Sequence, residues 1–435
     1  MGTMRQKAWK HRIRRIVKRV AGILSSLIAG NPRIIFGLQQ QWLKFGYHVL
    51  DLKMAAWVIR RPEWLMTKSS AVPALIAPEL PDSTSIDESI AKRLIGRYKA
   101  IREGERSSPN LIPENSMWGT LRQDHYSHLR GLVEKGDSRE LSQYLAKIFR
   151  TETVNGYSLG TQFDTLPHRW PYLAVGIELS IVTLAECLGI LRAENHEQGR
   201  TAYWRLEFSE EQLMNALEAH FGFRIEAPRF GDPRGIIFGG RFIARETCSH
   251  LYTAHRMREI FSREGIVDPL QIVEIGGGYG GACYWVRKLL GNRVATYTII
   301  DLPEVGLVQA YFLGSVDPSS LVLPGEARED ISSPIELVPY FNLEQVDFKP
   351  NVLFNQDSMP EMPQSEVERY VKWGSENLKG LFLSFNQEAY SPWAGTLQVL
   401  VPSVVSQFPQ YHRLSRETSW DRRGYVEEVY STLKH

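Results

Sequence analysis

A run of glycines and a distal aspartate give the strongest chemical signal in this sequence. The segment 272–281 reads IVEIGGGYGG, and the segment 297–303 reads YTIIDLP. Each begins with the unbroken apolar run that predicts a parallel strand buried on both faces. The glycines at 276–278 let the backbone approach a ligand closely, and the free N–H groups of the helix that follows point toward it. Asp301, at the end of the second strand, can accept hydrogen bonds from ribose hydroxyls. The pattern therefore predicts a site for a nucleoside-containing cofactor.

Two cofactors are compatible with this turn. Gly276, Gly278 and Gly281 satisfy the dinucleotide pattern GxGxxG, so a nicotinamide cofactor is one interpretation. Glu274 favours another, because a carboxylate so close to the turn would repel a pyrophosphate. The same carboxylate would attract the ammonium and sulfonium groups of S-adenosylmethionine. The turn leaves about 160 residues after it, enough for one methyltransferase-sized sheet. We therefore expect an S-adenosylmethionine-dependent methyltransferase, with an NAD(P)-dependent oxidoreductase as the alternative.

Polar residues also follow two later apolar segments. One segment leads into Asp357, Ser358 and Glu361, and the next leads into Glu388. In an open parallel sheet, ligands bind beyond the carboxyl ends of the strands. Methyl transfer to a hydroxyl needs alignment and a base for the hydroxyl proton, so Asp357, Glu361 and Glu388 are the candidate catalytic residues. Asp357 and Glu388 could also bind Mg²⁺ together, although the sequence holds no spacing typical of a dedicated metal site.

Four motifs together carry a resemblance to a known family. EIGGGYGG, YTIIDLPE, FNQDSMPEM and FLSFNQEA, in this order and spacing, resemble the sugar O-methyltransferase family of class I S-adenosylmethionine-dependent methyltransferases. The closing segment 420–428, WDRRGYVEE, resembles the C-terminal strand pair of that family. The resemblance is specific over 260–435, diffuse over 85–260, and does not cover 1–60.

The resemblance implies a fold, an activity and a set of site residues. It implies a Rossmann-like α/β sheet of seven mostly parallel strands with the last strand reversed. It implies transfer of a methyl group to a hydroxyl of a sugar, in a cell-surface glycan or a glycosylated metabolite. The adenine-side residue is left open between Glu326 and the pair Tyr340 and Phe341. The residues expected at the cofactor are Glu274, Gly276, Gly277, Gly278, Asp301, Leu302, Asp357 and Ser358.

The length of 435 residues predicts more than one folded part. We expect a linker over 66–85, an α-helical accessory and substrate domain over 86–260, and the methyltransferase domain over 261–435. The stretch 221–240 is rich in Gly, Pro and Arg and is expected to be a loop. Tyr252 and His255, on the helix that follows, are expected in the wall of the pocket.

The N-terminal region, residues 1–65, differs from the rest in charge. Residues 1–50 hold ten Lys and Arg and no acid, which leaves 41 basic against 49 acidic side chains in the remainder. An amphipathic pattern over residues 1–30 predicts peripheral association with an anionic membrane, with packing on the protein's own body as the alternative. The acidic body argues against nucleic acid as a partner. Three cysteines far apart in the sequence favour a reducing compartment, the cytoplasm. Together with the amphipathic pattern, this predicts a location in the cytoplasm or at the cytoplasmic face of the membrane.

Overall fold

The computed structural model describes residues 75–76, 85–114, 116–161, 164, 170–193, 204–328, 331–388, 398–422 and 424–433. The predicted basic helical region, residues 1–65, and almost all of the predicted linker lie outside the described residues. Membrane association through residues 1–30 therefore stays a prediction. In the part of the chain that is described, no helix is long and apolar enough to cross a bilayer.

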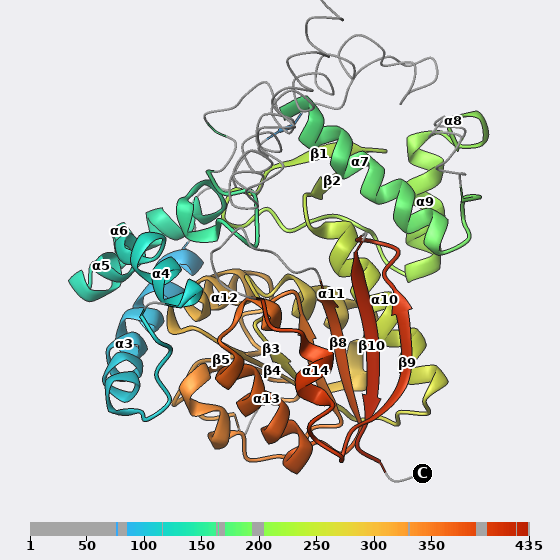
Figure 1. The fold of residues 1–435 in the computed structure, drawn as a ribbon. Helices are drawn as coiled ribbons and strands as arrows, with labels where there is room; N and C mark the ends of the chain where they lie inside the picture. Colours follow the sequence, from blue (N-terminus) through green and yellow to red (C-terminus); the bar gives the residue numbers. More distant parts are fainter. Residues whose placement is uncertain are drawn as a thin grey trace, which may run out of the picture. The chain divides into compact units, whose positions relative to one another are not determined.

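A single large sheet organises the C-terminal half (Figure 1). Its strand order is β5-β6-β4-β3-β7-β8-β10-β9, and neighbours from β5 to β8 are parallel, whereas β10 is antiparallel to both β8 and β9. The strands are β3 (Leu270–Ile275), β4 (Val294–Asp301), β5 (Leu321–Val322), β6 (Ile335–Pro339), β7 (Val352–Gln356), β8 (Leu381–Gln387), β9 (His412–Thr418) and β10 (Tyr425–Ser431). The predicted Rossmann-like sheet with a reversed strand is confirmed. It has eight strands rather than seven because the two-residue β5 pairs with the edge of β6.

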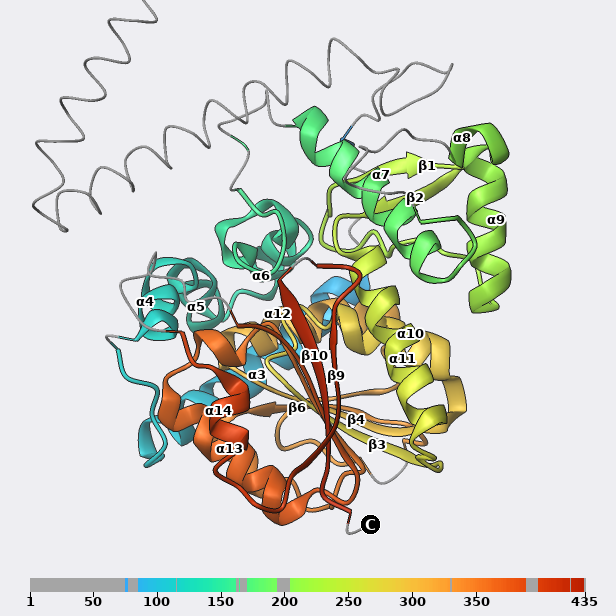
Figure 2. The same cartoon turned by 45° about the vertical axis from the view of Figure 1, so that its right-hand side comes forward.

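Helices cover both faces of this sheet (Figures 1 and 2). Alternate residues of β3 explain how: Ile272 packs into one apolar core with α10, α11 and α12, and Val273 packs into the other with α13 and α14. Both residues are fully buried, as the apolar run predicts. These helices are α10 (Thr247–Arg263), α11 (Gly281–Leu290), α12 (Pro303–Val316), α13 (Gln364–Asn377) and α14 (Val401–Val405).

The chain before the sheet is mainly helical, as expected. Its helices are α3 (Ser85–Ser107), α4 (Met117–Asp124), α5 (Ser127–Lys135), α6 (Ser138–Leu145), α7 (Trp170–Cys187), α8 (Trp204–Glu207) and α9 (Glu210–Phe221). The stretch 221–240 is not entirely a loop, because β1 (Gly235–Phe238) pairs in antiparallel with β2 (Arg241–Ala244). The expected domain boundary after residue 260 falls inside α10, which packs along α11 (Figure 2).

Candidate active site

The glycine turn joins β3 to α11 and accepts no larger residue at two positions. Gly276 has φ of 70°, in the left-handed region, and its N–H donates to the carbonyl of Ile300 at 2.8 Å. A Cβ at Gly276 would collide with the hydroxyl of Ser358. A Cβ at Gly277 would lie 2.7 Å from a methyl of Ile299 and 3.1 Å from a carboxylate oxygen of Glu274. The glycines therefore keep the backbone itself exposed to the space beyond the turn.

That space is a cavity of about 730 Å³ at the carboxyl ends of the parallel strands. Its size is in the usual range for a site that holds a small molecule. All the residues predicted at the cofactor line it, so the structure brings them together around one cavity: Glu274, Gly276, Gly277, Gly278, Asp301, Leu302, Asp357 and Ser358.

Glu274 is a buried carboxyl at the floor of the cavity. Its side chain is only 2% exposed, and the Tyr297 hydroxyl donates to its Oε2 at 2.9 Å. Burial raises the pKa of Glu274 to about 8, because the charged form is poorly solvated there. A cationic ligand would reverse this effect by stabilising the carboxylate. A cationic group of a ligand would be favoured at this position, and the predicted role of Glu274 at the cofactor stays a prediction.

Asp301 lies at the tip of β4 and is tied to the glycine turn. Its Oδ1 accepts a hydrogen bond from the N–H of Leu302 at 2.8 Å, and its Oδ2 accepts one from Gln309 Nε2 at 2.8 Å. The same Gln309 nitrogen donates to the carbonyl of Gly278 at 2.9 Å. Burial raises the pKa of Asp301 to about 7. Hydrogen bonds from Leu302, Gln309 and the backbone of Gly277 and Gly278 oppose this rise and hold the carboxyl against the glycine turn.

Asp357 follows β7 in an unusual backbone conformation. Its φ is 68°, which is uncommon for a residue with a side chain and often marks a functional site. Its N–H donates to Asn386 Oδ1 at 2.9 Å. Its side chain is held from both sides, because Tyr425 OH donates to Oδ1 at 2.5 Å and Arg422 pairs with Oδ2. The two donors come from the segment around the start of β10, which fixes the direction of the carboxylate.

The other two acids predicted to be catalytic lie in different places. Glu361 lines the cavity close to Asp357, and burial, followed by the charge of Asp357, raises the pKa of Glu361 to about 7. Glu388 does not line the cavity. Both of its oxygens pair with Arg416, at 2.6 and 2.5 Å, and these hydrogen bonds lower the pKa of Glu388. Only Glu361 and Asp357 are therefore placed to meet a substrate.

The expected Mg²⁺ pair is not formed. Asp357 and Glu388 each bind their own arginine, so they do not converge on a shared ion. Within the described ranges, no group of three or more His, Cys, Asp or Glu side chains is arranged to hold a metal.

The structure distinguishes between the two adenine-side alternatives. Tyr340 lines the cavity with Leu302, Ile112 and Trp118, so this end is largely apolar and aromatic. Glu326 lies elsewhere, where Arg93 Nη2 donates to it at 2.7 Å. Of the residues left open, Tyr340 therefore lines the cavity, and Phe341, its neighbour, is buried in the core.

The other end of the cavity is built by the segment 155–159, α7, the start of α10 with the two residues before it, and the segment before β10. It mixes polar side chains with Leu159, Leu173 and Leu179. Ser249 donates to Asp421, and burial raises the pKa of Asp421. Burial also raises the pKa of Glu246 to about 7 and lowers the pKa of His250 to about 4, so the imidazole is neutral at pH 7. The polar residues that line this end are Asn155, Ser158, Ser180, Thr183, Arg245, Glu246, Ser249, His250, Asp421 and Arg422.

Tyr252 and His255 were expected in this wall, and that prediction is wrong. Neither lines the cavity, and both line a separate surface groove on the far side of α10. Tyr252 donates instead to Glu427 of β10. His250, which the sequence reasoning missed, takes the place expected for them. It packs against the glycine turn so closely that a Cβ at Gly281 would collide with its ring.

Comparison with solved structures finds distant similarities. No family model and no curated protein matches the chain. Among solved structures, the chain is similar to the PH0226 protein from Pyrococcus horikoshii OT3, with 13% identity and a TM-score of 0.32 over 43% of this chain and 92% of that one. It is similar to magnesium protoporphyrin IX methyltransferase from Synechocystis PCC 6803, with 12% identity and a TM-score of 0.30 over 42% and 80% of the two chains. A SAM-dependent methyltransferase from Aquifex aeolicus matches at 12% identity and a TM-score of 0.30 over 42% and 90%. Similarities this low leave the cofactor and the substrate to be argued from the site itself.

Proposed function

We propose that this protein is an S-adenosylmethionine-dependent O-methyltransferase that acts on a hydroxyl of a sugar. The observation that carries the cofactor assignment is the pair of buried carboxyls, Glu274 and Asp301, on either side of a turn that only glycine can form. When bound, S-adenosylmethionine supplies an electrophilic methyl group on a sulfonium. Glu274 would hold the ammonium group, Asp301 the ribose, and Tyr340 the adenine end.

The polar end of the cavity supports a sugar as the acceptor. Carboxyl, guanidinium, imidazole and amide groups line it, and each can form directed hydrogen bonds with neighbouring hydroxyls. A polyhydroxylated acceptor could form additional hydrogen bonds with several of these groups, whereas an apolar acceptor could form none.

Within this proposal, the two acids beside the acceptor have different roles. Both oxygens of Asp357 are occupied by Arg422 and Tyr425, so Asp357 is suited to orienting an acceptor hydroxyl or the side chains around it. Glu361 has a pKa near 7, which suits a group that takes a proton close to neutral pH. We therefore assign the base to Glu361 and the orienting role to Asp357.

The cofactor assignment is tested by thermal unfolding with S-adenosylhomocysteine, with NADH and without ligand. A ligand that binds only the folded protein stabilises it by about 2.7 kcal/mol at a hundred times its Kd. We expect S-adenosylhomocysteine to raise the unfolding midpoint and NADH to leave it unchanged. A midpoint raised by NADH alone would contradict the proposal and favour the oxidoreductase.

The acceptor class is tested with methyl-labelled S-adenosylmethionine and a panel of sugars and sugar-containing metabolites. A methyl ether on a sugar survives mild alkali, whereas a methyl ester on a carboxylate is hydrolysed. We expect label that is stable to alkali in a sugar product. Label that is lost in alkali, or that is transferred only to amines, would refute O-methylation of a sugar.

A further inference from the structure

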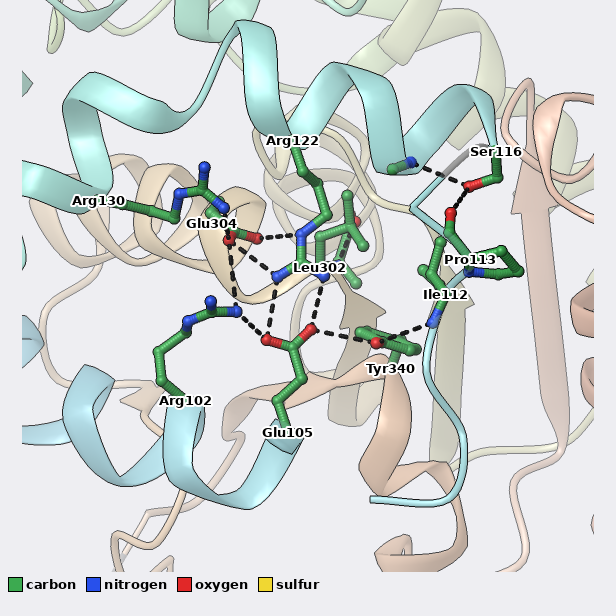
Figure 3. A network of polar contacts seen from close by, with 12 residues as sticks. Arg102, Glu105, Ile112, Pro113, Ser116, Arg122, Arg130, Leu302, Glu304 and Tyr340 are labelled. Carbon is green, nitrogen blue, oxygen red and sulfur yellow. Dashed lines mark hydrogen bonds and ion pairs between the residues drawn. The ribbon is translucent and has the colours of Figure 1, made fainter. Parts of the chain in front are cut away.

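A cluster of buried charges lies between the helical region and the cofactor end of the sheet (Figure 3). At its centre, Arg122 of α4 contacts two carboxylates from different parts of the chain. It donates to Glu105 of α3 at 2.6 and 3.0 Å, and to Glu304 of α12 at 2.9 and 3.0 Å. The three side chains are 12%, 4% and 0% exposed. A single guanidinium therefore joins three helices in the interior.

Further arginines surround the two carboxylates. Arg102 pairs with Glu105, and Arg130 of α5 lies 3.7 Å from Glu304. Burial alone would raise the pKa of Glu105, but the hydrogen bonds from Arg122 lower it below its ordinary value. Buried ion networks of this kind are seldom more stable than apolar packing of the same volume. Stability alone is therefore a weak reason for placing so many charges here, whereas fixing the position of α4 is a direct result of their geometry.

The network continues to the wall of the cavity. Tyr340 OH donates to Glu105 at 3.1 Å and accepts a hydrogen bond from the N–H of Ile112 at 3.3 Å. Glu304 lies in the first turn of α12, directly after Leu302 and Pro303. Among the residues of the helical region that line the cavity, four lie between positions 112 and 126, and we name them the cap: Ile112, Trp118, Leu121 and Tyr126. Arg122 lies about one helical turn after Trp118 on α4, so α4 carries both part of the cap and the centre of the network.

We propose that Arg122 is a positioning residue for the cofactor: through Glu105 and Glu304 it holds the cap against the adenosyl end of the cavity. This inference rests on the proposed cofactor. Under this inference, affinity for the adenosyl group depends on the ion pairs of Arg122 with Glu105 and Glu304, although Arg122 does not contact the ligand. Glu304 lies three residues after Asp301, which ends β4. The Arg122–Glu304 ion pair therefore also fixes the position of the cap relative to Asp301. Tyr340 contributes both as part of the wall and as the link to Ile112.

The experiment compares Arg122→Met with Arg241→Met. Arg241 is a matched control, because its side chain is 11% exposed and it donates to Glu218 at 2.8 and 3.1 Å and to Asn215 at 2.6 Å. None of these three residues lines the cavity. The full-length variants are titrated with S-adenosylhomocysteine by calorimetry, well below their unfolding midpoints. We expect both substitutions to lower the midpoint, and only Arg122→Met to weaken binding, by a factor of ten or more.

A milder pair covers the case in which Arg122→Met does not fold. Tyr340→Phe keeps the ring in the wall but removes the hydroxyl that joins Glu105 to Ile112. Its control is Tyr411→Phe, which removes a buried hydroxyl that donates to the carbonyl of Val371 at 2.9 Å, away from the cavity. We expect Tyr340→Phe to weaken S-adenosylhomocysteine binding at least threefold and Tyr411→Phe to leave it unchanged.

The outcomes separate this inference from the cofactor assignment. If the wild-type protein binds S-adenosylhomocysteine and both site variants bind it within a factor of two of wild type, the positioning role is refuted and the proposed function stands. If the control variants weaken binding as much as the site variants, the effect is one of general stability, and the positioning role is again refuted. If the wild-type protein does not bind S-adenosylhomocysteine, the cofactor assignment fails and the inference fails with it.

Discussion

Replacement of the buried Glu274 by glutamine should stabilise the ligand-free protein, and more strongly as the pH rises. Glu274 has an ordinary pKa of 4.5 in the unfolded chain and a pKa of about 8 in the fold. The folded state therefore holds the proton of Glu274 more tightly than the unfolded state does. The stability that this proton contributes to the fold is lost as the pH rises from 4.5 through 8. Glutamine is neutral at every pH and can still accept the hydrogen bond from Tyr297.

The size of the effect follows from the shift. Each pH unit between the two pKa values costs the wild-type protein about 1.4 kcal/mol. The free energy of unfolding of the wild type falls with pH up to the folded pKa and levels off above it. From about pH 6 to pH 8.5, the stability of Glu274→Gln relative to wild type should therefore grow by about 2.5 kcal/mol. Binding of S-adenosylmethionine should weaken in the same variant, because the ammonium group loses its carboxylate.

Urea unfolding at the two pH values, without ligand, measures this difference. Glu218→Gln serves as a control. Burial acts to raise the pKa of Glu218, but the hydrogen bonds from Arg241 and the Ile225 backbone, with the charges of Arg241 and Arg224, together lower it. Glu218 is ionised at both pH values, so its replacement should cost the same stability at each. The reasoning about Glu274 is refuted if the difference between Glu274→Gln and wild type does not change with pH, or changes in the opposite direction.

Three further predictions concern the turn and the acids around the acceptor. Gly276→Ala should abolish binding of S-adenosylhomocysteine, because φ is positive and the Cβ meets Ser358, whereas Gly131→Ala on α5, where a Cβ meets nothing within 4 Å, should bind normally in calorimetry. Glu361→Gln should lower kcat by about 10² to 10⁴ and remove the rise in rate through pH 7, and retention of that rise in a pH–rate profile would reassign the base. Glu388→Gln should leave kcat within about a factor of two of wild type, and EDTA should have no effect on the rate, since Glu388 pairs with Arg416 outside the cavity.

That the residues predicted at the cofactor line one cavity could be predicted from sequence, because they lie in local patterns. The glycine turn and Asp301 each lie at the end of an apolar run, and the carboxyl ends of neighbouring parallel strands must meet at one edge of a sheet. The same rule failed for Glu388. It follows β8, whose outer neighbour is the reversed β10, and Arg416 on β9 reaches it there. No local sequence pattern predicts the pairing of Arg416 with Glu388, which are 28 positions apart.

The acceptor half depends on contacts that sequence spacing does not show. His250 and His255 lie on one helix, but five residues rotate a side chain by roughly 140° around the axis, so only one of them can face the cavity. Packing of α10 against β10, where the Tyr252 hydroxyl donates to Glu427, determines which face of α10 is turned toward the cavity. The contact of Arg422 with Asp357 spans 65 positions and likewise becomes visible only in the fold.

The reversed strand β10 has a consequence for how the protein is made. The segment around the start of β10 supplies Arg422 and Tyr425 to Asp357. The parallel strands that carry the glycine turn and Asp301 can leave the ribosome and begin to pair earlier, since domains commonly fold during synthesis. The contacts of Arg422 and Tyr425 with Asp357, however, can form only after these residues have been synthesised and β10 has inserted between β8 and β9. Under the proposed function, a nascent chain would form the nucleoside-binding half of the pocket before the contacts that orient Asp357.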